Sequence, residues 1–242
     1  MRIPRFFADQ PLQADAEITL DSTLSHYIVT VLRLKEGAPL ILFNGDGADY
    51  PSQIVHGHKK HTSVLVDAQI SLHVESPLSL HLAQGVSKGD RMDFALQKSV
   101  ELGVTEITPV ITEYCNVKLS EERWLKKHEQ WQKIIISACE QCQRNRLPVL
   151  HPTLSFSQFV GQQSKKKKLI LAPGSESYLS GVGREPNGYI LLVGPEGGFS
   201  EQEVYTASQV AYTPVNLGPR ILRTETAALA SISILQATHG DL

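Results

Sequence analysis

The segment Tyr189-Ile190-Leu191-Leu192-Val193-Gly194-Pro195-Glu196-Gly197-Gly198-Phe199-Ser200 decides the fold of the second half of this chain. Its first five residues are all apolar, which is typical of a short strand buried on both faces of a parallel sheet. The three glycines that follow predict a tight turn in which another backbone or a ligand comes close. Ser200 and Glu203 have the spacing of a capping box, so a helix is expected to begin directly after Ser200.

A second segment repeats this order closer to the carboxyl end of the chain. Pro214–Leu217 predicts a short strand, and Gly218–Ala227 leads into a final helix that is apolar nearly all round. We expect that helix to be buried, either in the core or at a subunit interface. Arg220, Arg223 and Glu225 are charged side chains beside this apolar helix, and charges in such surroundings need partners. Two interpretations stay open, an ion pair between Arg223 and Glu225 or a ligand site.

The chain before these two segments also alternates strands with helices. Strands are predicted at Leu78–Ala83, Val104–Ile111 and Leu169–Leu171. Helices are predicted at Asp90–Leu102 and Glu121–Arg144, because their apolar residues recur in steps of three and four. This rhythm indicates an α/β domain with a parallel sheet.

The first seventy residues predict mostly β structure. Pro39–Phe43, Tyr50–Val55 and Ser63–Val66 are short apolar strands, and Asn44–Gly47 supplies the turn chemistry of a hairpin. A short helix is expected near Ser25–Leu32. The sequence therefore predicts two domains, a small β-barrel at residues 1–72 and an α/β domain at residues 73–242.

Charge and hydropathy restrict the possible functions. The formal net charge of −2 indicates no basic domain, so any nucleic acid must be bound by local patches or by pairing of subunits. No apolar run is long enough to cross a membrane, and the amino terminus has no apolar signal region. We therefore expect a cytoplasmic protein with no membrane partner.

The two glycine-containing segments carry a resemblance to a known family. Gly194–Phe199, followed later by Leu217–Ala227, closely resembles the RsmE family of SPOUT methyltransferases. Members of that family methylate N3 of a uridine in 16S ribosomal RNA. Shorter stretches also look like the family, so that the resemblance covers essentially the whole chain: Arg2–Phe7, His26–Gly37, Lys98–Val104 and Glu140–Arg144.

The resemblance implies more about the fold than the residue pattern does. It implies an α/β fold with a SPOUT-type C-terminal domain whose chain end forms a deep trefoil knot, preceded by a small PUA-like β-barrel. The knot rests on the resemblance alone, because general topology rules disfavour knots. The resemblance further implies a homodimer with the ligand pocket near the partner subunit.

The resemblance also implies S-adenosyl-L-methionine as cofactor and no metal. The cofactor is expected to lie bent in the knot, held by backbone groups of three loops. The residues implied are Leu171, Ala172, Gly194, Pro195, Glu196, Gly197, Gly198, Leu217, Gly218, Ile221 and Leu222.

The reaction itself suggests which side chains act. Uracil N3 carries a proton, so methylation there requires a base, stabilisation of the resulting anion and alignment of the methyl group. Arg223 is expected to stabilise the anion, because a guanidinium is always charged and offers several donors. Glu196 and Glu225 are the candidate bases, and each has the alternative role of capping a helix or holding an arginine.

The expected macromolecular substrate is 16S ribosomal RNA or the assembled small subunit. Basic side chains are expected to contact its phosphates, with Phe6 or Phe7 stacking on bases. The alternative is that these aromatic rings belong to the core of the barrel. The candidate RNA-binding residues are Arg2, Arg5, Arg33, Lys88, Arg91, Lys98 and Arg144.

Other functions remain open at this point. One is a SPOUT methyltransferase that acts on another RNA position, and a second is a non-catalytic RNA-binding ribosome assembly factor whose glycine turns are purely structural. A phosphate-binding hydrolase is disfavoured, because the chain has no Gly-Lys-Ser/Thr loop. His56, His58 and His61 are interpreted as a polar turn, because no carboxylate or cysteine stands at ligand spacing from them.

Overall fold

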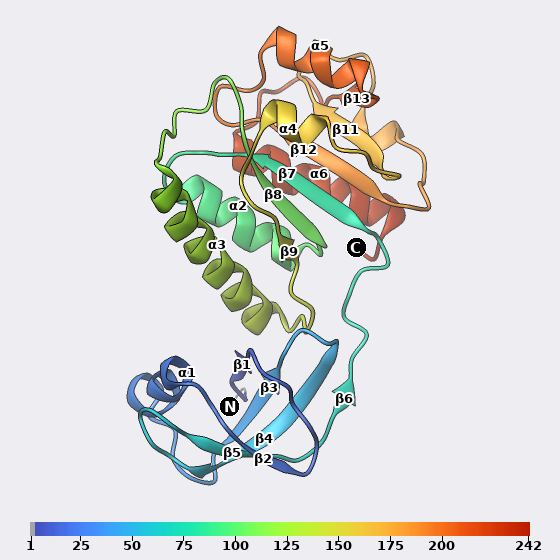
Figure 1. Ribbon diagram of the computed structural model, residues 1–242. Coiled ribbons are helices and arrows are strands. Elements are labelled where there is room, and N and C mark those ends of the chain that lie inside the picture. Colours follow the sequence, from blue (N-terminus) through green and yellow to red (C-terminus); the bar gives the residue numbers. More distant parts are fainter. Residues whose placement is uncertain (1–2) are drawn as a thin grey trace. The chain divides into compact units, whose positions relative to one another are not determined.

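The computed structural model describes residues 3–242, so the candidate Arg2 lies outside the described residues. The chain separates into two units (Figure 1). The first unit runs to Glu75 and also contains Cys139–Leu147, and the second contains Ser76–Ala138 and Pro148–Leu242. Within the described residues no helix is long and apolar enough to cross a membrane.

The first unit is built on one sheet with the strand order β1-β3-β4-β5-β2, and β6 pairs with β4. The pair β1 and β3 is parallel, whereas the other pairs are antiparallel. The strands are β1 (Arg5–Phe7), β2 (Ala16–Thr19), β3 (Pro39–Phe43), β4 (Ala48–His56), β5 (Ser63–Val66) and β6 (Ile70–Ser71).

The sheet of the first unit encloses an apolar core. Leu42, Tyr50 and Val64 are among its buried residues. The predicted short helix is present but begins earlier, as α1 (Ser22–His26), and continues as a π-helical turn at Tyr27–Val31. Its start is set by Asp21, whose carboxylate accepts hydrogen bonds from the amides of Thr23 and Leu24 at 2.7 and 3.0 Å.

Two arginines of the first unit are buried, although they were expected to contact RNA. The Arg5 guanidinium pairs with Asp49, donates to the carbonyl of Gln143 at 3.3 Å and lies over the ring of Phe43. Arg144 donates to the Glu75 carboxylate at 2.6 and 3.0 Å, and its side chain is 6% exposed. Because both guanidiniums are engaged inside the unit, neither presents its charge to a phosphate. Sequence patterns cannot separate a buried arginine from an exposed one.

The second unit contains a sheet in which every strand pair is parallel, with the order β10-β8-β7-β12-β11-β13 and with β9 beside β8. The predicted strands are present with small shifts, whereas the two-residue strands β9 and β10 were not predicted. The strands are β7 (Leu80–Gly85), β8 (Glu106–Ile111), β9 (Val149–Leu150), β10 (Leu154–Ser155), β11 (Lys167–Leu171), β12 (Tyr189–Val193) and β13 (Tyr212–Val215).

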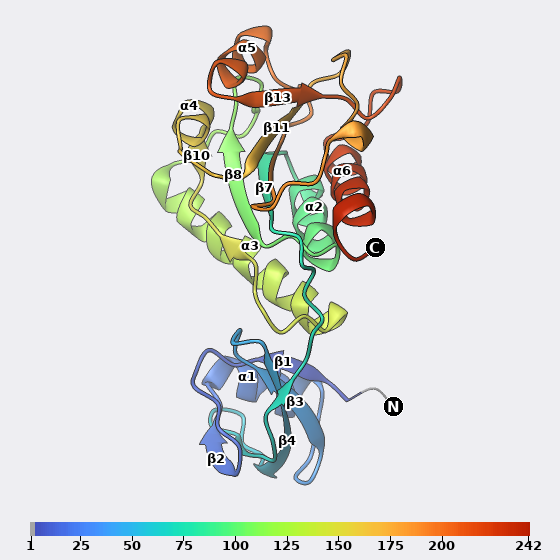
Figure 2. The same ribbon diagram turned by 90° about the vertical axis from the view of Figure 1, so that its right-hand side faces the viewer.

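Helices cover both faces of this sheet, with α2 and α6 on one face and α4 and α5 on the other (Figure 2). The capping box predicted at the start of α5 is confirmed, since Ser200 Oγ accepts the Glu203 amide at 3.2 Å and the Glu203 carboxylate accepts the Ser200 amide at 3.0 Å. The helices are α2 (Asp90–Glu101), α3 (Glu121–Cys142), α4 (Phe156–Val160), α5 (Glu201–Gln209) and α6 (Thr224–His239), with a 3-10 turn at Leu179–Gly181.

The buried pair in the first unit generates a stability prediction. Asp49→Ala leaves the Arg5 charge without its main partner in a site where the two side chains are 7% and 4% exposed, so we expect a loss of about 3–5 kcal/mol in the free energy of unfolding. Urea denaturation measures this loss. The matched control is Glu36→Ala. Glu36 pairs with His56 in the same unit, but the two side chains are 61% and 63% exposed. This substitution should therefore change the free energy of unfolding by less than about 1 kcal/mol. Equal losses in the two variants would contradict the prediction.

Candidate active site

The three loops predicted to bind a cofactor lie at one edge of the sheet. Strands β12, β11 and β13 are neighbours and run parallel, so their carboxyl ends meet at the same edge. The segments that leave them are 172–175, 194–199 and 216–222. Ligands of open parallel sheets bind at this type of edge, so the topology brings the predicted segments to a suitable place.

A cavity of about 60 Å³ lies between the loop after β11 and the loop after β13. Its apolar lining includes Leu171, Leu217, Leu222 and Ala227, the last from the first turn of α6. Asn216 shapes its rim, because its side-chain amide donates to the carbonyl of Ser175 and its oxygen accepts the Gly218 amide at 2.9 Å. Of the predicted cofactor residues, Leu171, Ala172, Leu217, Gly218 and Leu222 line this cavity, whereas Ile221 is 81% exposed.

A larger hollow of about 480 Å³ lies against the same loop after β11. It is bounded by Leu171–Ser175, by Phe199 and by Glu201, Val204 and Tyr205 at the start of α5. The loop that leaves β11 therefore has space beside it in two places, one towards α6 and one towards α5. This loop therefore borders both of these spaces.

The glycine turn after β12 has a packing role that the sequence left open. A Cβ atom at Gly194 would lie 2.9 Å from the backbone of Gly198, and one at Gly197 would lie 2.7 Å from Cβ of Tyr114. Gly85, at the end of β7, faces the turn, because its Cβ would lie 2.5 Å from the nitrogen of Pro195. Gly194 to Gly198 do not line the cavity between the other two loops. Gly85 and Gly194 therefore allow one backbone to pack on another, and Gly197 makes room for the side chain of Tyr114.

A chain of hydrogen bonds joins this turn to the start of α6. The Gln84 side-chain amide donates to Thr224 Oγ1 at 2.9 Å, and the Thr224 hydroxyl donates to the carbonyl of Gly194 at 2.6 Å. Gln84 is fully buried and Thr224 is 6% exposed, so water competes little for these bonds. The network connects strand β7, the glycine turn and the first residue of α6.

The three candidate catalytic residues occupy different settings. Arg223 is exposed at the N-cap of α6, and Glu225 lies in the first turn with a buried carboxylate oxygen that has no hydrogen-bond partner. No ion pair joins these two side chains within residues 3–242. Glu196 accepts the Lys88 amide at 3.1 Å and the Arg91 guanidinium at 3.0 Å. Glu196 therefore holds an arginine, which is the alternative to a role as base that the sequence left open for it.

The remaining predicted RNA contacts are more accessible than Arg5 and Arg144. Arg33 is exposed, and its backbone has a positive φ of 54°. Lys88 and Arg91 are exposed near Glu196, and Lys98 pairs with Glu101 at 2.7 Å. Phe6 is buried in the core of the first unit, which agrees with the alternative interpretation of that ring.

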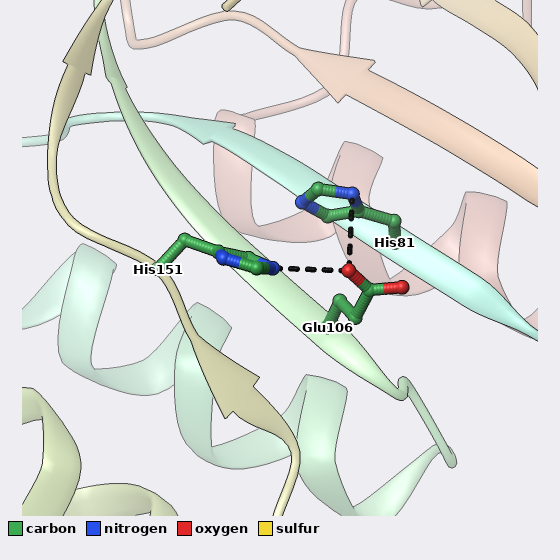
Figure 3. Close-up of side chains that lie close together, drawn as sticks. All are labelled: His81, Glu106 and His151. Carbon is green, nitrogen blue, oxygen red and sulfur yellow. Dashed lines mark hydrogen bonds and ion pairs between the residues drawn. The ribbon is translucent and has the colours of Figure 1, made fainter. Parts of the chain in front are cut away.

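A polar cluster that no sequence motif indicates lies at the opposite edge of the sheet. His81 and Glu106 are direct partners in the register of β7 and β8, and His151 follows β9 (Figure 3). Within residues 3–242 these three side chains form a group whose potential metal-binding atoms all lie within 4.8 Å of one another. No spacing motif links positions 81, 106 and 151, so only strand pairing reveals the cluster.

Burial and charge set the protonation of this cluster. Burial lowers the pKa of the His81 imidazole, and the charge of Glu106 only partly opposes that effect. Burial by itself would raise the pKa of Glu106, but hydrogen bonds from Lys166 and His151 outweigh it and lower the pKa. His81 is therefore neutral and Glu106 ionised at neutral pH.

Comparisons with known proteins agree with this architecture. Residues 74–236 match the family model described as RNA methyltransferase domain, and residues 20–66 match the model described as RNA methyltransferase PUA domain. The protein named Ribosomal RNA small subunit methyltransferase E from Buchnera aphidicola subsp. Schizaphis graminum is 38% identical, and the alignment covers 100% of this chain and 98% of the relative. This chain belongs to the RsmE family. The Bacillus subtilis protein of the same name is 35% identical over 87% of this chain and 86% of its own length.

Solved structures of RsmE relatives have the same fold. A Legionella pneumophila protein, solved in complex with the bound cofactor SAM, is 42% identical with a TM-score of 0.96, and each chain is covered to 100%. A Ribosomal RNA small subunit methyltransferase E from Neisseria gonorrhoeae, bound to S-adenosyl methionine, is 38% identical with a TM-score of 0.92 and the same coverage. The predicted family membership and the predicted α/β domain with a PUA-like domain are confirmed.

The packing of the glycine turn gives a second prediction. In Gly85→Ala the new methyl group would collide with the backbone of Gly194 and Pro195, so we expect a loss of about 1–3 kcal/mol in the free energy of unfolding of this RsmE protein. Chemical denaturation measures it. Gly183→Ala is the control, because a Cβ there meets nothing within 4 Å and its φ is not positive, so it should be neutral. A stable Gly85→Ala protein would show that the turn has room to shift.

Proposed function

We propose that this RsmE family member transfers a methyl group from S-adenosyl-L-methionine to N3 of a uridine in 16S ribosomal RNA. The observation that supports this most is the meeting of the three loops at the carboxyl edge of β11, β12 and β13, in a chain that aligns over its full length with the two relatives solved with that cofactor. A second RNA position as target is the alternative that the same fold allows.

The residues at the loop edge fit an adenosyl group. Leu171, Leu217, Leu222 and Ala227 offer apolar walls of the kind that enclose an adenine ring. The cavity of about 60 Å³ is smaller than the roughly 300 Å³ of a typical ligand pocket. The rest of the ligand must therefore lie outside it, and the hollow beside the loop after β11 is the nearest space of sufficient size. In this proposal the glycine turn has a packing role and does not line the cavity itself; its residues are Gly194, Pro195, Glu196, Gly197 and Gly198.

The reaction requires a base and a positive charge, and we assign these roles to Glu225 and Arg223 at the start of α6. When bound, S-adenosyl-L-methionine supplies an electrophilic methyl group. Glu225 takes the proton from uracil N3, because its carboxylate oxygen Oε2 has no hydrogen-bond partner, whereas Oε1 of Glu196 already accepts the Lys88 amide and the Arg91 guanidinium. Arg223 stabilises the negative charge that develops over the uracil ring as the proton leaves.

The RNA is bound by the basic side chains that the fold leaves accessible. We assign phosphate contacts to Arg33 in the first domain, residues 1–72, and to Lys88, Arg91 and Lys98 in the second, residues 73–242. Arg2 stays in this set from the sequence, and Arg5 and Arg144 are left out because they are buried in ion pairs. The N3 atom of a paired uridine is inaccessible, so the target must be unpaired or flipped.

We further propose that the protein acts as a homodimer and that its C-terminal segment forms the trefoil knot implied by the family resemblance. Leu229 and Ile234 of α6 are only half-buried, and Ile221 is 81% exposed beside the cavity. A partner subunit that covers these apolar side chains would complete the wall of the ligand site.

Methyl transfer to small ribosomal subunits that lack the modification tests the proposal. Arg223→Ala should reduce the rate about 100-fold or more, because it removes a donor that matters in the transition state, and should leave cofactor affinity within about threefold. Labelled cofactor measures the rate and calorimetry the affinity. Arg184→Ala, which removes an exposed arginine, is the control. Equal loss of rate and affinity would place Arg223 in the cofactor pocket, and methylation mapped to another atom would overturn the N3 assignment.

The cavity gives a separate test of the cofactor site. Ala227→Leu would fill it, so we expect cofactor affinity to fall at least about tenfold while the circular dichroism spectrum stays unchanged. Ala237→Leu, at an exposed position of the same helix, should bind like the wild type. Normal affinity of Ala227→Leu would place the ligand elsewhere on this edge.

A further inference from the structure

The cluster of His81, Glu106 and His151 lies at the opposite edge of the sheet from the loops after β11, β12 and β13. His81 is the second residue of β7 and Glu106 the first of β8, so both stand at the amino ends of parallel strands. The cluster opens into a cavity of about 390 Å³ whose lining includes Thr108, Phe159, Lys166 and Tyr212. The proposed methyl transfer uses none of these residues.

The three side chains point their ligand atoms at one another (Figure 3). His151 Nε2 lies 3.0 Å and His81 Nδ1 lies 3.8 Å from the same carboxylate oxygen of Glu106, Oε2. Zinc bonds of about 2.1 Å at tetrahedral angles place ligand atoms about 3.4 Å apart. The two separations from Glu106 Oε2 lie on both sides of that value, and all the ligand atoms of the group lie within 4.8 Å of one another, so side-chain rotations would bring them to three corners of a tetrahedron.

The outer contacts of the cluster are those that a metal site needs. His81 Nε2 is hydrogen-bonded to Thr108 Oγ1 at 2.8 Å, which fixes the imidazole ring with Nδ1 towards Glu106. Lys166 donates to the other carboxylate oxygen, Oε1, and so leaves Oε2 for an ion. The cavity beside the cluster has room for a water molecule as the fourth ligand.

We propose that His81, Glu106 and His151 bind one divalent transition-metal ion, Zn²⁺ by preference, at this edge of the sheet. Two imidazoles and one carboxylate are the ligand types that zinc accepts, whereas Mg²⁺ and Ca²⁺ prefer oxygen ligands alone. The ion ties β7, β8 and the segment after β9 together, so its role is to stabilise the second unit. The competing explanation is that the Lys166 ammonium already neutralises Glu106 and that no ion binds.

Metal titration of the untagged, metal-free, full-length protein tests this inference without reference to methyl transfer. We expect one Zn²⁺ per chain by calorimetry, a rise in melting temperature when Zn²⁺ is added, and the absorption of tetrahedral Co²⁺ when that ion replaces it. In His151→Ala, which alters the most exposed of the three ligands, Zn²⁺ affinity should fall at least about tenfold. Mg²⁺ should give no rise in melting temperature.

Two further variants separate the metal site from its alternatives. Lys166→Met removes the competing positive charge, so it should bind Zn²⁺ more tightly than the wild type, and unchanged or weaker binding would contradict the proposal. His58→Ala is the control for adventitious binding, because His58 and His61 stack with ring centres 3.7 Å apart on the surface of the first unit. If affinity falls in His58→Ala and stays normal in His151→Ala, or if Zn²⁺ does not bind, the proposed site is overturned.

Discussion

The hydroxyl group of Thr224 holds together the edge of the sheet on which the candidate site depends. It accepts a hydrogen bond from Gln84 of β7 and donates one to the carbonyl of Gly194 in the turn after β12. Because Thr224 is also the first residue of α6, this contact fixes where the final helix begins. The loop after β13 must then span from Val215 to that point, and the cavity lies along this span.

The glycines around this contact are required because backbones approach one another there. Gly85 and Gly194 face neighbouring backbone atoms at distances that no side chain allows, and the buried Gln84 lies beside Gly85. A glycine-rich turn is commonly explained by ligand contact alone. In this protein the turn packs against β7 and Tyr114, and the cavity next to it is lined by the loops after β11 and β13.

The two edges of one parallel sheet carry different chemistry. At the carboxyl edge the loops are long and the lining is largely apolar, which suits a nucleoside. At the amino edge the strands present His81 and Glu106 directly, and the neighbouring Lys166 and His151 supply a dense set of charged and polar groups. The two edges lie at opposite ends of the strands. Side chains at the amino edge can therefore affect the stability of the second unit without contacting the proposed reacting atoms.

The sequence by itself determined the local elements and the family. The apolar run Tyr189–Val193, the capping box of Ser200 and Glu203, and the long helix from Glu121 were all predicted, because a few neighbouring residues encode each of them. The resemblance of Gly194–Phe199 and Leu217–Ala227 then indicated the family, which the comparisons confirmed.

Only the tertiary structure decided which charged side chains are free to contact RNA or a ligand and which are engaged in ion pairs. Arg5 meets Asp49, Arg144 meets Glu75 and Glu196 meets Arg91, each across a sequence separation that no local pattern spans. The same holds for the pairing of His81 with Glu106, which depends on the register of β7 against β8. Local periodicity depends on residues a few positions apart in the sequence. Burial and ion pairing depend on strands and loops that meet only when the chain has folded.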